Sequence, residues 1–243
     1  MNIVILAAGY GTRLYPLTLN TPKPLLAING KPIINFLIEK IERLRSCFPV
    51  KEVRIVSNNK FYNNFSQWKR KYKVKAKIIN DGSNSPDDRK GAIGDIKFAI
   101  GAKRGDWLIL GGDNLFEDDL VQFVKFALKM KPYPSVGLYD VREKNIARRF
   151  GVVKVDSARR ILDLEEKPKD PPSTLIATCI YFFPQMSLNF FDLYLNQESY
   201  LDASGKYIEW LTKKTKVYGH TSQGSWFDIG HRDALRWAEK KFK

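Results

Sequence analysis

The sequence predicts an α/β protein with a Rossmann-like, mostly parallel central sheet flanked by helices and a mixed or antiparallel second half. Short apolar runs rich in β-branched residues occur at 3–6, 53–57, 76–79 and 107–110, and helical patterns separate the first three of them. Strands that alternate with helices indicate right-handed βαβ crossovers and a parallel sheet. Beyond Pro134 short strands and turns replace that alternation, which predicts the second half.

The first apolar run ends at Ala7-Ala8-Gly9, where the side chains are small and the backbone is accessible. Gly9 and Gly11 permit the positive φ angles that turn successive N–H groups into an anion-binding concavity. Arg13 and Lys23 follow with no acidic residue near them in the sequence. This stretch therefore predicts a polyphosphate site with two unpaired cations.

Two better-known phosphate loops do not fit this stretch. A dinucleotide fingerprint needs a third glycine where Leu14 stands and an acid after the second strand, where Asn58 stands instead. A P-loop needs Gly-Lys-Ser/Thr at the start of a helix, whereas Pro16 disfavours helix at the residue before it. Spacing alone leaves two alternatives, a phosphate site and a tight turn with scattered surface cations.

The wider motif adds specificity. Leu-Ala-Ala-Gly-Tyr-Gly-Thr-Arg-Leu at 6–14, Pro-Leu-Thr at 16–18 and Pro-Lys-Pro-Leu-Leu at 22–26 closely resemble the signature of the sugar nucleotidyltransferases, or NDP-sugar pyrophosphorylases. The resemblance is to the short members that act as glucose-1-phosphate thymidylyltransferases or uridylyltransferases. It implies that the loop lies over the nucleoside triphosphate and that Arg13 and Lys23 stabilise the leaving pyrophosphate. The loop residues so implied are Leu6, Ala7, Ala8, Gly9, Gly11, Thr12 and Arg13.

Composition sets broader bounds. At 243 residues and 44% hydrophobic, the chain is long enough for a sizeable core, and we expect one catalytic domain over 1–243. The charge of +15 suits anionic partners without naming them. In the basic run at 69–77, the alternating second half favours an exposed strand with lysines facing water over a nucleic-acid stripe.

Cys47 and Cys179 are far apart and outside any metal-ligand spacing, which predicts neither a disulfide scaffold nor a zinc site. The first apolar run is too short for a signal peptide, and no window is long enough to span a bilayer. We therefore expect a cytoplasmic protein that binds neither membrane nor nucleic acid. The oligomeric state is left open, with a homo-oligomer among the alternatives.

The next elements follow the α/β pattern. Asn29-Gly30 predicts a turn, and the apolar residues from Ile33 to Leu44 recur at helical spacing. A strand at 53–57, a helix at 61–68 and a strand at 76–79 come next. The segment 80–94 is polar and glycine-rich, and a loop after a parallel strand lies at the ligand-binding edge of such sheets.

The family resemblance implies that this segment helps to bind the base, with Gly91 close to the ring. A plain flexible loop is the alternative. Thymidylyl members usually have Lys-Gln where this chain has Lys23-Pro24, and a different segment at 80–94, so the sequence leaves the base open among dTTP, UTP and CTP.

The stretch from Trp107 to Asn114 is typical of a buried strand that ends in glycines and an acid, and a helix is expected from Phe116 to Met130. A carboxylate at the tip of a parallel strand is well placed to hold a hard cation that bridges phosphate oxygens, so Asp113 is the first expected metal ligand. A turn into the helix is the alternative. The resemblance implies the metal role and adds Gly112 to the nucleotide-binding residues.

In the second half we expect strands at 135–141, 150–155, 160–165 and 174–183. The segments Phe-Gly-Val-Val, Glu-Glu-Lys-Pro and Ala-Thr-Cys-Ile-Tyr-Phe resemble the family's sugar-binding segments. This implies that Gly151, Glu166 and Thr178 lie at the sugar and that Lys167 holds its phosphate. A charged hairpin end is the alternative for the second segment, and Cys179 replaces a glycine frequent in the family.

The chain continues with expected helices at 185–195 and 204–212, a strand at 216–220 and a terminal helix at 232–242. Trp226-Phe-Asp-Ile-Gly resembles the family's Trp-x-Asp-x-Gly motif, which implies that Asp228 is the second metal ligand; a helix N-cap is the alternative. His220 and His231 are the only histidines, and we expect both to be structural or peripheral.

Together the residues and the resemblance predict transfer of a nucleoside monophosphate from an NTP to a sugar 1-phosphate with Mg²⁺ as cofactor. The resemblance implies glucose 1-phosphate as the acceptor and dTTP or UTP as the donor. A sugar 1-phosphate is largely dianionic at neutral pH, so it needs no general base. A cytidylyltransferase acting on phosphocholine or a polyol phosphate is the alternative enzyme. A basic nucleic-acid-binding protein is the alternative from another class, although no recognition motif accompanies its charge.

Overall fold

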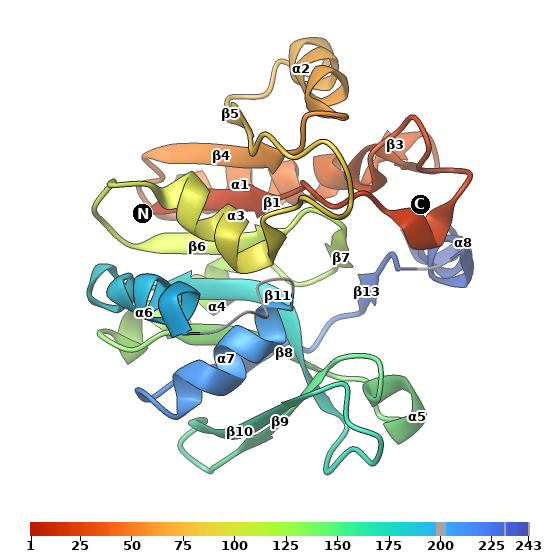
Figure 1. Ribbon diagram of the computed structural model, residues 1–243. Helices are drawn as coiled ribbons and strands as arrows, with labels where there is room; N and C mark the ends of the chain where they lie inside the picture. Colours follow the sequence, from red (N-terminus) through yellow and green to blue (C-terminus); the bar gives the residue numbers. More distant parts are fainter. Residues whose placement is uncertain (198–202, 231, 243) are drawn as a thin grey trace. The chain divides into compact units, whose positions relative to one another are not determined.

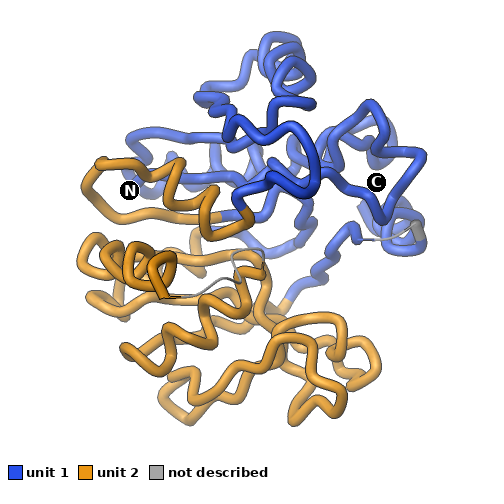
Figure 2. Tube along the Cα trace, viewed as in Figure 1, with its two compact units in different colours: residues 1–90, 110–120, 224–243 blue, residues 91–109, 121–223 orange. Residues whose placement is uncertain are grey.

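The computed structural model describes residues 1–197, 203–230 and 232–242. It contains two compact units, which Figure 2 colours separately. Unit 1 comprises residues 1–90, 110–120 and 224–243, and unit 2 comprises residues 91–109 and 121–223. Unit 1 therefore combines three stretches of chain that are far apart in the sequence. One catalytic domain over 1–243 stays a prediction.

Unit 1 contains the parallel strands that the sequence predicts. β1 (Asn2–Leu6) pairs in parallel with β4 (Glu52–Ser57), which pairs in parallel with β5 (Lys77–Asn80). α1 (Ile33–Cys47) and α2 (Tyr62–Lys71) lie between these strands in the sequence, and Figure 1 shows the alternation. The predicted βαβ pattern is confirmed.

The apolar face of α1 is buried as the helical spacing predicts. Its buried apolar residues are Ile33, Ile34, Leu37, Ile41 and Leu44. Lys40 lies among them and is only 8% exposed. Its ammonium donates hydrogen bonds of 2.8 and 2.9 Å to the carbonyl oxygens of Glu117 and Asp118. The helix therefore covers the sheet and also binds the turn at 117–118.

The glycine loop and its continuation contain two short 3-10 helices, η1 (Thr12–Leu14) and η2 (Lys23–Leu25). A small hairpin of β2 (Ala27–Ile28) and β3 (Lys31–Pro32) follows. Its turn residues have φ of 49° at Asn29 and 82° at Gly30, which confirms the predicted turn.

The basic run differs from its predicted form. α2 extends to Lys71 and β5 begins only at Lys77, so the second half of the run is a connection rather than a strand. Lys73 has φ of +52°, and the N–H of Ala76 donates to the carbonyl of Val74. This local turn prevents extended pairing. The lysines at 71, 73, 75 and 77 are exposed, as expected.

The segment after β6 (Trp107–Gly111) also differs from its prediction. The helix expected from Phe116 begins only at α4 (Leu120–Met130). Residues Asn114–Phe116 form β7, which pairs antiparallel with β13 (Trp226–Asp228). A partner strand about 110 residues away overrides the local helical preference.

Unit 2 contains the mixed sheet that the sequence predicts. Its strands are β8 (Ser135–Asp140), β9 (Gly151–Val155), β10 (Ile161–Glu166), β11 (Leu175–Phe183) and β12 (Tyr218–Thr221). β9 pairs antiparallel with β10 and β11, and β11 pairs antiparallel with β8. β12 is parallel to β8. With the parallel strands of unit 1, this confirms the predicted α/β fold class.

The helices of unit 2 are α3 (Gly91–Ile100), α5 (Lys144–Ala147), α6 (Asn189–Gln197) and α7 (Ser204–Thr212), besides α4. α3 corrects the prediction that the loop after β5 continues to residue 94, because the helix already begins at residue 91. The expected helix at 185–195 divides into a 3-10 turn, η3 (Gln185–Ser187), and α6.

The C-terminal segment completes the core of unit 1. Buried apolar residues from the N-terminal loop, α1, β7 and the end of the chain form one cluster: Leu14, Ile28, Ile33, Leu115, Ile229, Ala234 and Ala238. The last two belong to α8 (Arg232–Lys241). Within the described residues no helix is long and apolar enough to cross a bilayer.

Candidate functional site

The glycine loop after β1 is a tight turn with one left-handed residue. Gly11 has φ of +65°, and its carbonyl accepts hydrogen bonds from the N–H of Leu14 at 2.9 Å and from the hydroxyl of Thr18 at 2.7 Å. A left-handed residue in such a turn directs neighbouring N–H groups to one side. The loop is therefore a tight turn at Gly11 that buried Thr18 holds in place, and its expected anion-binding concavity stays a prediction.

Gly9 does not use the left-handed conformation that we expected of both glycines, since its φ is not among the positive ones. A Cβ atom added to Gly9 would meet nothing within 4 Å, and the residue is exposed. Neither backbone conformation nor packing within the chain therefore explains a glycine here. Close approach of a bound molecule to the backbone would explain it.

Hydrogen bonds to β4 and the residues after it fix the start of the loop. The N–H of Ala7 donates to the carbonyl of Val56 at 2.9 Å. The side-chain amide of Asn58 donates to the carbonyl of Ala8 at 2.8 Å, and Asn58 is fully buried. The two alanines are buried as well, so the loop emerges from a rigid strand end.

Gly112 is required by packing within the chain. Its N–H donates to the carbonyl of Leu6 at 2.9 Å. A Cβ atom at Gly112 would lie 2.8 Å from that carbonyl oxygen and 3.2 Å from the ring of Pro24. Its expected contact with nucleotide stays a prediction, because these contacts already explain the glycine.

Tyr10 connects the glycine loop to the segment after β5. Its hydroxyl lies 3.4 Å from the hydroxyl of Ser83, which donates to the carboxylate of Asp81 at 2.8 Å. All three residues are buried, and burial raises the pKa of Tyr10. The chain of hydrogen bonds therefore fixes the start of the segment expected to bind the base. Gly91 lies in unit 2, where it begins α3 with φ of +73°.

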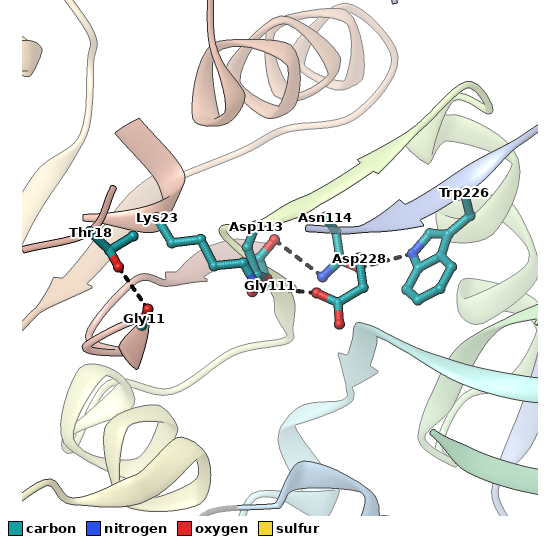
Figure 3. Close-up of polar contacts among 8 residues, drawn as sticks. All are labelled: Gly11, Thr18, Lys23, Gly111, Asp113, Asn114, Trp226 and Asp228. Carbon is teal, nitrogen blue, oxygen red and sulfur yellow. Dashed lines mark hydrogen bonds and ion pairs between the residues drawn. The ribbon is translucent and has the colours of Figure 1, made fainter. Parts of the chain in front are cut away.

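The two expected metal ligands, Asp113 and Asp228, both contact the ammonium of Lys23. The Lys23 ammonium lies 2.5 Å from Asp113 Oδ2 and 3.2 Å from Asp228 Oδ1. Figure 3 shows Lys23 reaching from the N-terminal segment toward both carboxylates. Lys23 is 9% exposed, and the two aspartate side chains are 32% and 27% exposed. Residues 90 and 205 positions from Lys23 thus converge on a single positive charge.

This arrangement corrects the expectation that Lys23 is an unpaired cation. Burial by itself would lower the pKa of Lys23, but the nearby carboxylates of Asp113 and Asp228 outweigh it and raise that pKa. Burial raises the pKa of Asp228, and the positive charge of Lys23 opposes that shift. Lys23 is therefore charged at neutral pH and compensates the two acids.

The β7–β13 ladder brings Asp228 beside Asp113. Asp228 is opposite Asn114, the neighbour of Asp113. The Trp226 indole N–H donates to the side-chain oxygen of Asn114 at 2.8 Å, and the Asn114 amide donates to the carbonyl of Gly111 at 3.5 Å, as Figure 3 shows. Buried Asn114 and Trp226 therefore set the register that positions Asp228.

A second set of contacts holds the start of β13. The N–H of Gly224 donates to Asp118 Oδ1 at 2.9 Å, and the N–H of Ser225 donates to Glu117 Oε2 at 2.8 Å. The N–H of Glu117 donates back to the carbonyl of Ser225 at 2.9 Å. Hydrogen bonds from Ser225, with a contribution from Lys241, lower the pKa of Glu117 to about 2.

The side chain of Arg13 lies near Asp228, beside Gly230. A Cβ atom built on Gly230 would lie 3.2 Å from Asp228 Oδ2 and 3.7 Å from a guanidinium nitrogen of Arg13. The charge of Arg13 also acts on Asp228, where it favours the ionised carboxylate. The four residues expected to carry the chemistry, Arg13, Lys23, Asp113 and Asp228, therefore gather in unit 1.

The two carboxylates fit a magnesium ion. Both already share one cation, the Lys23 ammonium, and carboxylate oxygens are ligands that Mg²⁺ prefers. Within the described residues, no group of three or more His, Cys, Asp and Glu side chains could hold a metal ion. Mg²⁺ commonly takes one or two carboxylates and completes its shell with water and substrate phosphates, so two ligands suffice.

Unit 2 contains the residues expected at the sugar. Gly151 on β9 is opposite Glu166 on β10, and a Cβ atom at Gly151 would lie 3.1 Å from Glu166 Oε2. A Cβ atom at Gly205, on α7, would overlap the same carboxylate oxygen. Burial raises the pKa of Glu166, although the charge of Lys167 opposes this. Two glycines therefore leave space around a half-buried carboxylate.

Lys167 and Thr178 differ in exposure. The Lys167 ammonium is 3.8 Å from Glu166 Oε1, and its side chain is 63% exposed. Thr178 is buried and its hydroxyl donates to the carbonyl of Gly137 at 2.9 Å. These contacts give Thr178 a structural role, and its expected contact with the sugar stays a prediction.

An aromatic cluster in unit 2 is interior packing. Phe183, Phe191, Tyr194 and Tyr207 are each at most 2% exposed and contact one another edge to face or stacked. They form no open aromatic cage of the kind that binds a quaternary ammonium. His220 packs against the rings of Phe123 and Phe126, in keeping with a structural role, and His231 lies outside the described residues.

Several supporting residues were not among the predicted site residues. Thr18 and Trp226 lie within the recognised motifs, so the motif itself was the available signal. Tyr10 gave a weaker signal as a large residue between two glycines. Asn114 and Gly205 gave no signal in the sequence, because their roles depend on partners that are distant along the chain.

Comparison with known proteins assigns the chain to a family. The Nucleotidyl transferase family matches residues 2–243. The chain belongs to this family. The predicted family resemblance is thereby confirmed over nearly the whole sequence, while the roles expected of Arg13, Lys23, Asp113 and Asp228 stay predictions.

Individual relatives agree with this assignment. The chain is 33% identical over 232 residues to the bifunctional protein GlmU of Methanococcus aeolicus, covering 95% of this chain and 51% of the relative. It is 27% identical to the glucose-1-phosphate adenylyltransferase of Clostridium acetobutylicum, covering 96% of this chain and 64% of that protein. The chain thus spans about half of the length of its GlmU relative.

Among solved structures, the chain resembles a Bacillus anthracis protein assigned as a glucose-1-phosphate thymidylyltransferase, crystallised with sucrose. The TM-score is 0.84 at 23% identity, and the match covers 99% of this chain and 94% of the other. At this identity the likeness supports the fold, and it agrees with the α/β class predicted from the sequence.

The contacts of Glu117 predict pH-dependent stability. Its folded-state pKa of about 2 lies below the ordinary 4.5, so its contribution is present above about pH 4.5 and is lost as the pH falls toward 2. Glu117→Gln should lower the Tm at pH 7 by about 1–3 °C, a modest effect because the side chain is partly exposed. Thermal unfolding between pH 2.5 and 7 measures it.

The difference from the wild type should shrink as the pH falls through this window. Glu42→Gln, a change on the exposed side of α1, serves as the control and should alter Tm little at any pH. A constant Tm difference at all pH values would contradict the assignment to Glu117 ionisation.

Proposed function

We propose that the chain transfers a nucleoside monophosphate from a nucleoside triphosphate to a sugar 1-phosphate and releases pyrophosphate. The observation that carries the proposal is the convergence of Asp113 and Asp228 on one cation, next to Arg13 and the glycine loop. Membership of the Nucleotidyl transferase family supports it, and the names of two relatives point to glucose 1-phosphate as acceptor.

The nucleotide is proposed to bind in unit 1. The glycine loop offers backbone N–H groups to the phosphates, and Gly9 leaves the backbone uncovered there. Gly112 and the buried residues from Leu6 to Ala8 hold the loop. Tyr10 fixes the segment proposed to meet the base, with Gly91 at its far end.

The reaction needs positive charge more than a base. The dianionic sugar phosphate oxygen attacks the α-phosphorus in line, a new P–O bond forms, and the bond to the pyrophosphate oxygen breaks. Two unit negative charges at contact distance repel by about 4 kcal/mol at an effective dielectric near 20. Arg13 and Lys23 would offset this repulsion and stabilise the charge on the leaving pyrophosphate.

Asp113 and Asp228 would hold a magnesium ion, their hard oxygen ligands being the type it prefers. When bound, Mg²⁺ supplies Lewis-acid stabilisation of phosphoryl oxygens and orients the triphosphate. The chain's own part is to fix both carboxylates on the β7–β13 ladder. Neither histidine is needed as a proton carrier, because the attacking group is already deprotonated.

The sugar phosphate is proposed to meet residues of unit 2. A carboxylate accepts hydrogen bonds from vicinal hydroxyls, which suits Glu166 between Gly151 and Gly205. Lys167 would bind the phosphate as a mobile point charge. Thr178 would support the pocket from the adjacent strand through its bond to Gly137.

The activity is tested by measuring pyrophosphate release from dTTP, UTP, CTP, ATP and GTP, each with several sugar 1-phosphates, phosphocholine and a polyol phosphate. We expect turnover with a sugar 1-phosphate that requires Mg²⁺. Asp113→Asn and Asp228→Asn should each lower kcat/KM by about 100-fold or more, since each removes a charge from the proposed metal site.

A folded chain that releases no pyrophosphate with any sugar phosphate, or that keeps full activity in both variants, would contradict the proposal. Turnover restricted to phosphocholine or the polyol phosphate would assign the alternative acceptor. Asp163→Asn, an exposed acid on β10, provides a control that should retain activity.

The two loop glycines predict opposite mutational effects. Gly9→Ala should leave stability within about 0.5 kcal/mol of wild type, because the added methyl meets open space. It should raise KM for the triphosphate about tenfold, because that methyl would lie where the phosphates approach the backbone. Steady-state kinetics and chemical denaturation measure the two effects.

Gly11→Ala is the contrasting variant, since it would strain a left-handed residue at a cost of about 1–2 kcal/mol and lie 3.1 Å from Thr18. If Gly9→Ala destabilised the protein as much as Gly11→Ala without changing KM, Gly9 would have only a structural role.

Lys167 is proposed to bind the sugar phosphate and not the triphosphate. Lys167→Ala should raise KM for the sugar 1-phosphate about tenfold, or about 1.4 kcal/mol, and leave KM for the triphosphate near the wild-type value. Lys169→Ala removes an exposed lysine two residues away and is the control. Equal effects of the two changes would indicate a general loss of positive charge.

A further inference from the structure

The position of Lys23 raises a conflict within the proposed site. Its ammonium is within 2.5 Å of Asp113 Oδ2 and 3.2 Å of Asp228 Oδ1, so it occupies the space between the two carboxylates. A magnesium ion bound by the same oxygens would lie about 2.1 Å from each ligand atom. The ammonium and the ion would overlap, and their like charges would repel.

Lys23 therefore cannot keep both contacts while a metal ion is bound by these same two oxygens. Its side chain can leave, because a four-carbon stem carries the ammonium and has several rotatable bonds. Its backbone stays in place, since η2 begins at Lys23 and the N–H of Leu26 donates to the Lys23 carbonyl at 3.1 Å. The ammonium can move while the loop that holds it does not.

We propose that Lys23 is a built-in counter-ion that holds the cation position between Asp113 and Asp228 and yields it to the metal only when a polyphosphate arrives with the metal. The polyphosphate is what makes the exchange favourable, since it gives the displaced ammonium a new anionic partner. This inference rests on the proposed function. It predicts that the protein without polyphosphate binds divalent metal weakly. The metal must then displace the Lys23 ammonium from the two carboxylates, and the displaced ammonium has no phosphate to bind.

A static structural ion pair would behave differently. Buried ion pairs of this type often add little stability, because the desolvation of both partners offsets their attraction. If Lys23 only stabilised the fold, its ammonium would stay on the two carboxylates whether or not metal and polyphosphate were present. The two roles therefore predict different responses of the Lys23 ammonium when metal and polyphosphate are added together.

The test measures Mn²⁺ binding to the free protein by electron paramagnetic resonance, without nucleotide. Lys23→Met removes the charge and keeps the approximate length of the side chain, and it should bind Mn²⁺ at least about tenfold more tightly than wild type. Lys31→Met is the matched control, since Lys31 also forms an ion pair in unit 1, with Glu39, away from the two aspartates. It should bind like wild type.

The outcomes separate this inference from the proposed function. Equal Mn²⁺ affinity in wild type and Lys23→Met would overturn the counter-ion role and leave the metal site standing. Absence of Mn²⁺ binding in both, with and without inorganic tripolyphosphate, would overturn the metal site itself. The tighter Mn²⁺ binding of Lys23→Met should disappear when Asp228→Asn is added, because one of the two carboxylates is then replaced by a neutral amide.

Thermal unfolding gives a second readout. Lys23→Met leaves two carboxylates together without their cation, so Mg²⁺ should raise its Tm by several degrees more than it raises that of the wild type. A variant that folds only with Mg²⁺ supports the inference for the same reason. Equal responses to Mg²⁺ in both proteins would oppose it.

A measurement on the wild type covers the case in which Lys23→Met does not fold. The ¹⁵N-labelled Lys23 ammonium, identified by its absence in Lys23→Arg, should shift when Mg²⁺ and inorganic tripolyphosphate are added together. Mg²⁺ alone should change it little. A resonance that is unchanged by the mixture, or equally changed by Mg²⁺ alone, would overturn the inference.

Discussion

The candidate site in unit 1 depends on the compensation of two neighbouring carboxylates by one ammonium. Two carboxylates that share a partly buried place repel each other and favour protonation unless a cation neutralises them. Lys23 meets this requirement from the N-terminal segment, while Asp113 and Asp228 come from the other two segments of unit 1. The ladder of β7 and β13, the Trp226–Asn114 bond and the contacts of Glu117 all hold the acids against this charge. The ion pairs thus connect all three segments of the unit.

The glycines show how structural and functional constraints differ. Gly11 needs its left-handed backbone, Gly112 needs to approach Leu6, and Gly205 needs to leave space for Glu166. Each of these requirements arises inside the chain. Gly9 has no such requirement, since it has neither a positive φ nor a neighbour for its missing Cβ. A glycine that the fold does not require indicates a contact with something outside the chain, which is where the phosphates are proposed to lie.

The sequence predicts those parts that depend on local pattern or on recognised motifs. The β-branched run of β1 and the apolar face of α1 encode their own burial, and the motif at 6–26 identifies the site loop. The strand β7 was not predicted, and its last residue, Phe116, was placed in a helix, because its partner strand lies about 110 residues away. Similarly, Lys23 looked unpaired because its acids are 90 and 205 residues distant. The residues next to β7 and Lys23 in the sequence do not indicate such distant partners. The predictions about strand pairing and ion pairing are therefore wrong at the site.

The charges of the site explain how it can be both stable and active. Arg13, Lys23, Asp113 and Asp228 sum to zero, so the protein without ligands need not bury net charge at this place. A triphosphate needs strong positive charge, which a neutral site does not supply. If Lys23 moves onto the phosphates as the metal takes its place, both cations face the substrate and the two acids remain neutralised. A neutral resting site therefore becomes positive when metal and polyphosphate arrive together, which is the moment at which the transfer reaction requires it.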